Sequence, residues 1–192
     1  MPFTFKQCFT EDGQVIKGLL EIFPRIFEDE RGNFSETYVK RDFNAAGLEM
    51  DFVQDNQSCS VRGVLRGLHY QKNHPQGKLA RVIMGEVFDV ALDLRPNSAS
   101  YGKWYSVILS GKKQNQFYLP PGFAHGFLVL SETCIFTYKC TDFYYPDDEG
   151  GVIWNDPTVN IAWPDLGINY IVSKKDGNLP RFYHCLPIKE IK

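Results

Sequence analysis

The sequence predicts an all-β protein, a sandwich or barrel made of many short strands. Its dominant hydrophobic period is two, most clearly in residues 85–94, where large apolar side chains alternate with small or acidic ones. The apolar segments are short and are separated by glycine and proline, which mark turns or bends. Only one short segment has a helical pattern. Many strands and few helices in one domain are typical of a sandwich or a barrel.

The individual strands follow from the same alternation. Residues 65–71, LRGLHYQ, are interpreted as a strand with Arg66 on one face and His69 on the other. Residues 85–94 predict a half-buried strand that carries Asp89 and Asp93 on its polar face. Further strands are expected at residues 19–27, 104–109, 115–120, 125–130 and 134–140.

Two segments depart from the strand pattern. Residues 40–48 predict a short helix, for which Gly47 supplies a C-terminal stop. The chain from about Trp163 onward is polar and irregular, and we expect it to pack across the exterior or the mouth of the barrel.

Composition limits the classes of function. A length of 192 residues fits one domain, residues 1–192, with a sizeable core. The net charge of −2 does not favour nucleic-acid or membrane-surface binding, both of which need a basic field. The five cysteines lack a CxxC spacing, so neither a disulfide framework nor a zinc site is indicated. Without a signal-peptide pattern or an apolar run of roughly 18 residues, we expect a cytoplasmic protein that is not in a membrane.

Histidines are the first candidates for chemistry. Of the four, His69 and His125 lie in strand-like segments with aromatic neighbours, so both could point into one pocket, while His74 lies in a turn and His184 near the C-terminus. A metal-dependent cupin would need two or three imidazoles and a carboxylate at one point, and a close HxH pair is absent. The alternative that His69 and His125 are hydrogen-bonded core residues stays open.

Lys78 and Tyr138 extend this set to proton abstraction beside a carbonyl. Histidine accepts a proton near neutral pH, a lysine cation stabilises the enolate oxygen, and tyrosine returns a proton from the other face. Taken alone, Lys78 could equally be a solvated surface lysine, and Tyr138 a packed aromatic.

Arginines raise the question of a phosphate ligand. The chain has neither GxxxxGK[ST] nor GxGxxG, so side chains such as Arg31 and Arg66 would have to bind a phosphate or pyrophosphate. For Arg31, a surface ion pair with Asp29 or Glu30 is the competing interpretation.

Eight segments of the sequence carry a family resemblance. They are DERGNFSETY, FVQDNQSCSVRGVLRGLHYQ, PQGKLARVIMGEVFDVALDLR, YGKW, PPGFAHGFLVLS, YKCTDFYYP, WNDPTVNIAWP and SKKD. In these segments the chain resembles the dTDP-4-dehydrorhamnose 3,5-epimerases, whose fold is a cupin-type jelly roll. Two departures, SKKD for the more usual SEKD and MGE for RGE, touch no proposed catalytic group.

The resemblance implies an epimerase that needs no metal or organic cofactor and converts dTDP-4-dehydro-6-deoxy-D-glucose to dTDP-4-dehydro-L-rhamnose. It implies His69 as the general base, paired with Asp176. Lys78 would stabilise the enolate oxygen, Tyr138 would be the opposing acid, and His125 would line the sugar pocket. For the nucleotide it implies Arg31, Glu36, Gln54, Asn56, Arg66, Glu149 and Lys175, with Phe34 and Tyr144 flanking the base.

The family resemblance also implies a homodimer, in which Arg31 and Phe34 serve the neighbouring subunit. Three other functions remain open at this point. The first is a mono-epimerase that acts at one carbon only. The others are a non-catalytic binder of sugar nucleotides and a metal-dependent cupin oxygenase.

Overall fold

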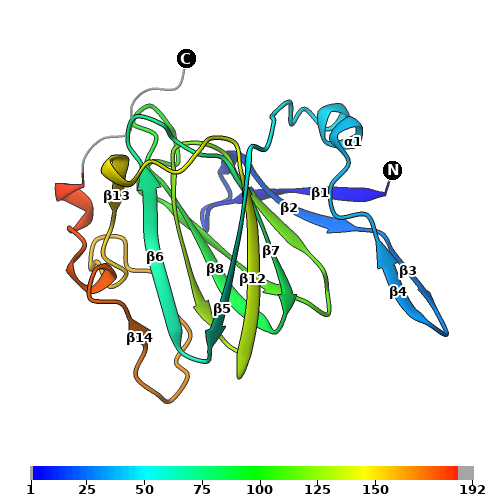
Figure 1. The fold of residues 1–192 in the computed structure, drawn as a ribbon. Helices are drawn as coiled ribbons and strands as arrows, with labels where there is room; N and C mark the ends of the chain where they lie inside the picture. Colours follow the sequence, from blue (N-terminus) through cyan, green and yellow to red (C-terminus); the bar gives the residue numbers. More distant parts are fainter. Residues whose placement is uncertain (1, 186–192) are drawn as a thin grey trace.

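Two six-stranded sheets pack face to face in the computed structural model, which describes residues 2–185 (Figure 1). All strand pairs are antiparallel except the short pairing of β14 with β6. The first sheet has the order β1 (Phe3–Phe9), β2 (Val15–Pro24), β10 (Gln116–Leu119), β7 (Lys78–Met84), β12 (Thr133–Cys140) and β5 (Gln54–Val61). The second has the order β13 (Glu149–Gly151), β6 (Val64–Gln71), β11 (Phe123–Val129), β8 (Glu86–Asp93) and β9 (Trp104–Ser110), with β14 (Ile171–Val172) beside β6.

Within residues 2–185, helical structure is confined to short pieces: α1 (Lys40–Ala45), η1 (Pro146–Asp148), η2 (Asp176–Asn178) and η3 (Phe182–His184). The all-β prediction of a sandwich or barrel is therefore confirmed, with a sandwich found. The short helix is confirmed as well, and after it Gly47 adopts a φ of +82°. The predicted strand at residues 19–27 is divided, because β2 ends at Pro24 and a separate hairpin strand begins at Ile26. No helix in the described part of the chain is long and apolar enough to cross a membrane.

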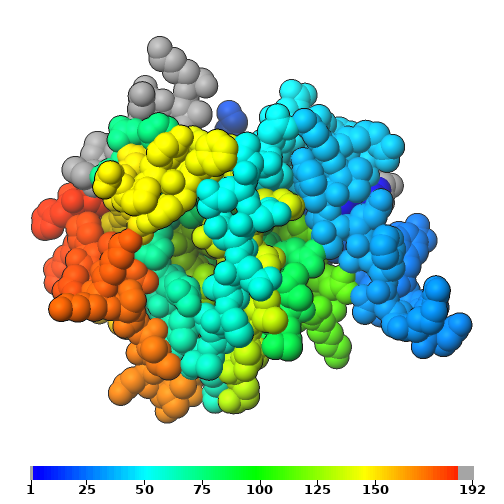
Figure 2. All heavy atoms as spheres, in the orientation of Figure 1, coloured from blue at the N-terminus to red at the C-terminus, as the bar shows by residue number. Residues whose placement is uncertain are grey.

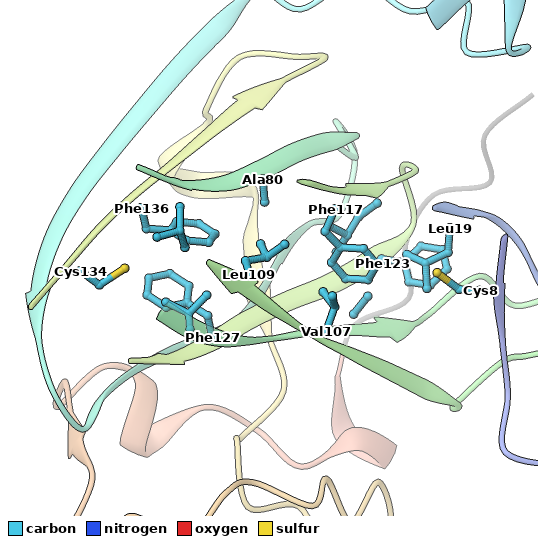
Figure 3. Packing of buried hydrophobic residues seen from close by; sticks show 14 of the residues in the cluster. Cys8, Leu19, Ala80, Val107, Leu109, Phe117, Phe123, Phe127, Cys134 and Phe136 are labelled. Carbon is cyan, nitrogen blue, oxygen red and sulfur yellow. The ribbon is translucent and has the colours of Figure 1, made fainter. Parts of the chain in front are cut away.

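The main core lies between the two sheets (Figure 3). Phe136 of β12 and Phe127 of β11 stack with their ring centroids 4.2 Å apart, and so join one sheet to the other. Burying a side chain of this size contributes on the order of 1.5–3 kcal/mol, so this cluster is a major source of stability.

Strand β8 is buried on both faces, and this corrects the predicted half-buried strand. Val87 and Ala91 face the main core, while Val90 and Leu92 face a second core formed with the C-terminal segment. Asp89 and Asp93 are therefore fully buried instead of solvated. The expectation that the segment from about Trp163 onward packs across the exterior is confirmed, because Phe182 is buried in this second core and Trp163 packs against it.

The hairpin of β3 (Ile26–Asp29) and β4 (Gly32–Ser35) projects from the body of the molecule (Figures 1 and 2). Gln114 and Gln116 anchor its base: the Gln114 side chain contacts Asn33 and Ser35, and Gln116 Nε2 donates to the carbonyl of Thr37. The aromatic side chains of Phe27 and Phe34 are exposed on it.

Candidate active site

A cavity of about 600 Å³ opens between the two sheets. Strands β6 and β11 of one sheet contribute Arg66, His69 and His125, and strands β7 and β12 of the other sheet contribute Lys78 and Tyr138. The two walls therefore present different chemical groups to anything bound between them. Residues 171–176 close one side and bring Asp176 to the cavity.

A β-bulge in β6 brings Arg66 and His69 to the same cavity, which corrects the expected alternation. His69 pairs with His125 and Arg66 with Phe127, so two residues of β6 lie opposite Gly126 alone. Gly67 has a φ of +110°, and a Cβ there would lie 2.6 Å from the carbonyl oxygen of His125. Only glycine permits this approach, and the strand alternation is lost between the two polar side chains.

His69 and Asp176 form a hydrogen-bonded pair. The distance from His69 Nε2 to Asp176 Oδ1 is 2.8 Å, and the backbone N–H of Gly67 donates to Oδ2 at 3.1 Å. Burial disfavours the charged carboxylate, but the hydrogen bonds from the His69 ring and the backbone N–H of Gly67 outweigh it, so the pKa of Asp176 lies below its usual value. An ionised Asp176 accepts only, so Nε2 must carry the proton and the Nδ1 lone pair of neutral His69 is free.

His125 pairs with a residue that sequence reasoning missed. His125 Nε2 lies 2.9 and 3.0 Å from the two carboxylate oxygens of Asp89, and both side chains are buried. Burial raises the pKa of Asp89. The sequence did contain a signal for Asp89, because this acidic residue shares a strand face with the apolar Val87 and Ala91. Such a position is typical of a buried carboxylate that has a partner.

Lys78 and Tyr138 lie together on the opposite wall. Lys78 Nζ is 5.8 Å from the centroid of the Tyr138 ring. Burial lowers the pKa of Lys78 and raises the pKa of Tyr138 to about 12. Lys78 is therefore not the solvated surface lysine of its competing interpretation. Tyr138 does pack against the main core, as its competing interpretation described, and its hydroxyl stays protonated at neutral pH.

A polar network stands at the rim beside His69. The Tyr144 hydroxyl donates to Glu149 Oε2 at 2.7 Å, and Lys175 Nζ donates to the same oxygen at 2.6 Å. These bonds outweigh burial and keep the pKa of Glu149 below its usual value. Gln54 joins the network to the cavity, because its amide accepts from the backbone N–H of Tyr144 and donates to Asn56.

Asp148 clamps the loop that carries this network. Its carboxylate accepts hydrogen bonds from the backbone N–H groups of Asn73 and His74 and from the Asn73 side chain, at 2.6–3.0 Å. Gln71 adds bonds to the carbonyls of His74 and Phe143. Sequence analysis placed His74 in a turn, as found, but gave no signal for Asp148.

The three hairpin residues predicted for the nucleotide lie away from this cavity in the single chain. Arg31 is 83% exposed and pairs with Asp29 at 2.5 Å, as its competing interpretation described. Phe34 and Glu36 are also exposed. Within residues 2–185, no group of three or more His, Cys, Asp or Glu side chains could hold a metal ion.

Comparisons with known proteins agree with this geometry. The family model of dTDP-4-dehydrorhamnose 3,5-epimerase matches residues 14–184. The enzyme of that name from Methanothermobacter thermautotrophicus is 53% identical over 164 residues, which are 85% of this chain and 89% of that protein. The crystal structure of dTDP-6-deoxy-D-glucose-3,5-epimerase from Legionella pneumophila, in complex with dTDP-4-keto-L-rhamnose, is 44% identical. It superposes with a TM-score of 0.89 over 98% of this chain and 100% of that one.

A more distant likeness is to a 3'-monoepimerase from Streptomyces bikiniensis, solved with dTDP-quinovose. It is 33% identical, with a TM-score of 0.80 over 85% of this chain and 83% of that one. Sequence, fold and the residues gathered in the cavity lead to one conclusion: the chain belongs to the dTDP-4-dehydrorhamnose 3,5-epimerase family.

Proposed function

We propose that the chain converts dTDP-4-dehydro-6-deoxy-D-glucose to dTDP-4-dehydro-L-rhamnose by inverting carbons 3 and 5. The observation that carries this proposal is the His69–Asp176 pair on one wall of a cavity whose other wall carries Lys78 and Tyr138. Both carbons flank the C4 ketone, so one proton-abstraction chemistry serves both centres.

In this proposal His69 is the general base. Its Nδ1 takes the proton from the sugar carbon, while Nε2 continues to donate to Asp176. The carboxylate of Asp176 fixes this tautomer and stabilises the imidazolium that forms. The electron pair of the broken C–H bond moves into the enolate.

Lys78 would stabilise the enolate and Tyr138 would complete the inversion. The buried ammonium acts at short range in a site of low dielectric, where it stabilises a developing oxyanion more strongly than in water. Tyr138 lies on the sheet opposite that of His69, so its hydroxyl can return a proton to the other face of the deprotonated sugar carbon. His125 would line the sugar pocket. With the ketone and Lys78 sharing the charge, the reaction needs no metal or organic cofactor.

The nucleotide would lie along the rim. Arg66 lines the cavity and Lys175 belongs to the rim network, so both cations are available to a pyrophosphate, and Tyr144 offers an aromatic face for the base. Gln54, Asn56 and Glu149 complete this set as polar contacts.

We also propose a homodimer in which the hairpin residues Arg31, Phe34 and Glu36 complete the neighbour's site. The projecting hairpin and the exposed Val61 and Ile83 on the outer face of the first sheet support it. Arg81 lines a hollow of about 360 Å³ on that face and has no carboxylate partner among residues 2–185. An exposed apolar face that carries such an arginine is typical of a protein interface.

The remaining expectations stay proposals of the same kind. We propose a single functional domain over residues 1–192, of which 1 and 186–192 lie outside the described residues. We propose a cytoplasmic location and no nucleic-acid or membrane partner, supported by the net charge of −2.

Incubation with the 4-keto nucleotide sugar in deuterated water tests the reaction. Deuterium at both C3 and C5 of the product, read by NMR, is the expected result. Label at one carbon alone would instead support the mono-epimerase, which the likeness to the Streptomyces bikiniensis enzyme keeps as the second candidate.

Two further classes are separated by other measurements. A non-catalytic binder would show no exchange at all, in the wild type or in His69→Ala. A metal-dependent oxygenase would contain stoichiometric iron on metal analysis of the purified protein.

A further inference from the structure

Glu149 joins two parts of the site that sequence analysis treated separately. Its Oε2 accepts from Tyr144 and Lys175, and its Oε1 lies 3.9 Å from His69 Nε2. The nucleotide set was expected to contain Glu149, yet one of its oxygens is engaged by the chain itself and the other approaches the base. A carboxylate is also poorly suited to the pyrophosphate, because the two are anions.

The position of this carboxylate is fixed from both sides. Glu149 begins β13 and pairs with Gln71 of β6, and the preceding Asp148 is held by Asn73 and His74. Lys175 and Asp176 are neighbours in sequence, so one segment supplies both the cation on Glu149 and the carboxylate on His69. A change of charge or position at Lys175 can therefore affect His69 both through Glu149 and through the adjacent Asp176.

Proton transfer changes the charge at this point. When Nδ1 takes a proton from the sugar carbon, the imidazole gains one positive charge and the enolate oxygen one negative charge. The protonated Nε2 of the resulting imidazolium lies 2.8 Å from Asp176 Oδ1 and 3.9 Å from Glu149 Oε1. Two carboxylates stabilise that cation better than one, provided that the second is not fully neutralised.

We propose that Glu149 is a positioning residue for His69, a second carboxylate that stabilises its protonated ring, and that Lys175 limits this stabilisation by holding the other oxygen. This inference rests on the proposed function, because it assumes that His69 is the base. It also gives Lys175 and Tyr144 a second role besides nucleotide binding. A ligand that draws them away from Glu149 would leave more negative charge on this carboxylate beside His69.

Other charged groups face His69 as well. Arg66 lies on the same strand, and Lys78, Tyr138 and His125 line the cavity from β7, β12 and β11. All of these are unchanged in the variants below, so they affect every profile equally.

The test is the pH profile of kcat/KM for Glu149→Gln and Lys175→Met, compared with the wild type. Without Glu149 the imidazolium is less stable, so the acidic limb should move to lower pH by about half to one unit. Without Lys175 the carboxylate acts at full strength, so the limb should move to higher pH. Asp147→Asn removes a charge from an exposed neighbour and should leave the limb within about 0.2 units.

Shifts of opposite sign support the proposal. Unmoved limbs, or limbs that move in the same direction, overturn it, as does a loss of dTDP affinity in Glu149→Gln with an unchanged profile. NMR titration of the His69 ring gives a readout that does not need turnover, and its midpoint should fall in Glu149→Gln. If the wild type shows no isotope exchange, the proposed function itself fails. If only the role of Glu149 is wrong, the wild type still exchanges deuterium but the acidic limbs of the variants do not shift.

Discussion

Asp176 lies 107 positions beyond His69 in the chain, and the two side chains meet at 2.8 Å. Asp176 Oδ1 accepts a hydrogen bond from the His69 ring, and Oδ2 accepts one from the backbone N–H of Gly67. The carboxylate therefore fixes both the ring and the bulged strand that carries it.

Replacing Asp176 by asparagine should disable the base. An amide has one acceptor, so it can serve Gly67 or His69 but not both, and an NH₂ facing Nε2 would favour the wrong tautomer. We expect kcat to fall on the order of 10²–10⁴-fold, and stability to fall by about 1–3 kcal/mol because one of the two donors loses its acceptor. A rate near that of the wild type in stopped deuterium-exchange assays would contradict the tautomer argument.

Tyr138→Phe should separate proton removal from inversion. The hydroxyl, whose pKa burial raises to about 12, is a proton donor throughout the neutral range. Without it, we expect deuterium still to enter the substrate from the His69 face, while formation of the inverted product falls on the order of 10²-fold. Tyr101→Phe removes the same atom from a half-exposed tyrosine outside the cavity and should change neither rate. Equal loss of exchange and product in Tyr138→Phe would mean that Tyr138 is not the acid.

The sequence predicted the fold class and several strands because apolar alternation is a local property. It failed at β5, since Gln54–Val61 places polar side chains on both faces, one toward the cavity and one outward. It also placed Arg66 and His69 on opposite faces, because a bulge depends on the partner strand, which local alternation does not report. Asp89 was assigned to a solvated face for the same reason: the polar face of β8 is the interior of the sandwich. The His69–Asp176 contact came only from the family resemblance, because no local pattern links residues so far apart.

Asp148→Asn should weaken substrate binding more than turnover. The amide would place an NH₂ group against N–H donors of Asn73 and His74, loosening the loop that carries Tyr144 and Glu149. We expect KM to rise about tenfold, kcat to stay within about twofold, and stability to fall by about 1–3 kcal/mol. Asp147→Asn is the matched control, since it is exposed and adjacent. A fall in kcat at constant KM would assign Asp148 a different role.

Mixing two inactive variants tests the shared site. If Arg31 serves the neighbouring subunit, a heterodimer of Arg31→Ala and His69→Asn contains one intact site and one doubly altered site. Random exchange of subunits should restore about a quarter of wild-type activity. If each site belongs to one chain, mixing restores nothing, and sedimentation would show whether dimers form at all.

Acid should destabilise the fold through its buried carboxyls. Hydrogen bonds outweigh burial and hold the pKa values of Asp93, Asp148, Asp156 and Asp176 below their usual range. A carboxyl whose folded-state pKa is depressed adds stability above its unfolded pKa, about 3.9, and loses it as the pH falls through the folded value. Urea midpoints should therefore decline steadily below about pH 4, and a constant midpoint down to pH 2 would contradict these assignments.

The stacked pair Phe127 and Phe136 has a consequence beyond stability. It spans the two sheets two residues before Tyr138 and two residues after His125, with its ring centroids 4.2 Å apart. Because His69 and Tyr138, the proposed base and acid, belong to different sheets, the separation of those sheets is also the clearance left for the substrate. We therefore expect the Phe127–Phe136 pair, by fixing the distance between the sheets, to limit the thickness of the sugar ring that fits between His69 and Tyr138.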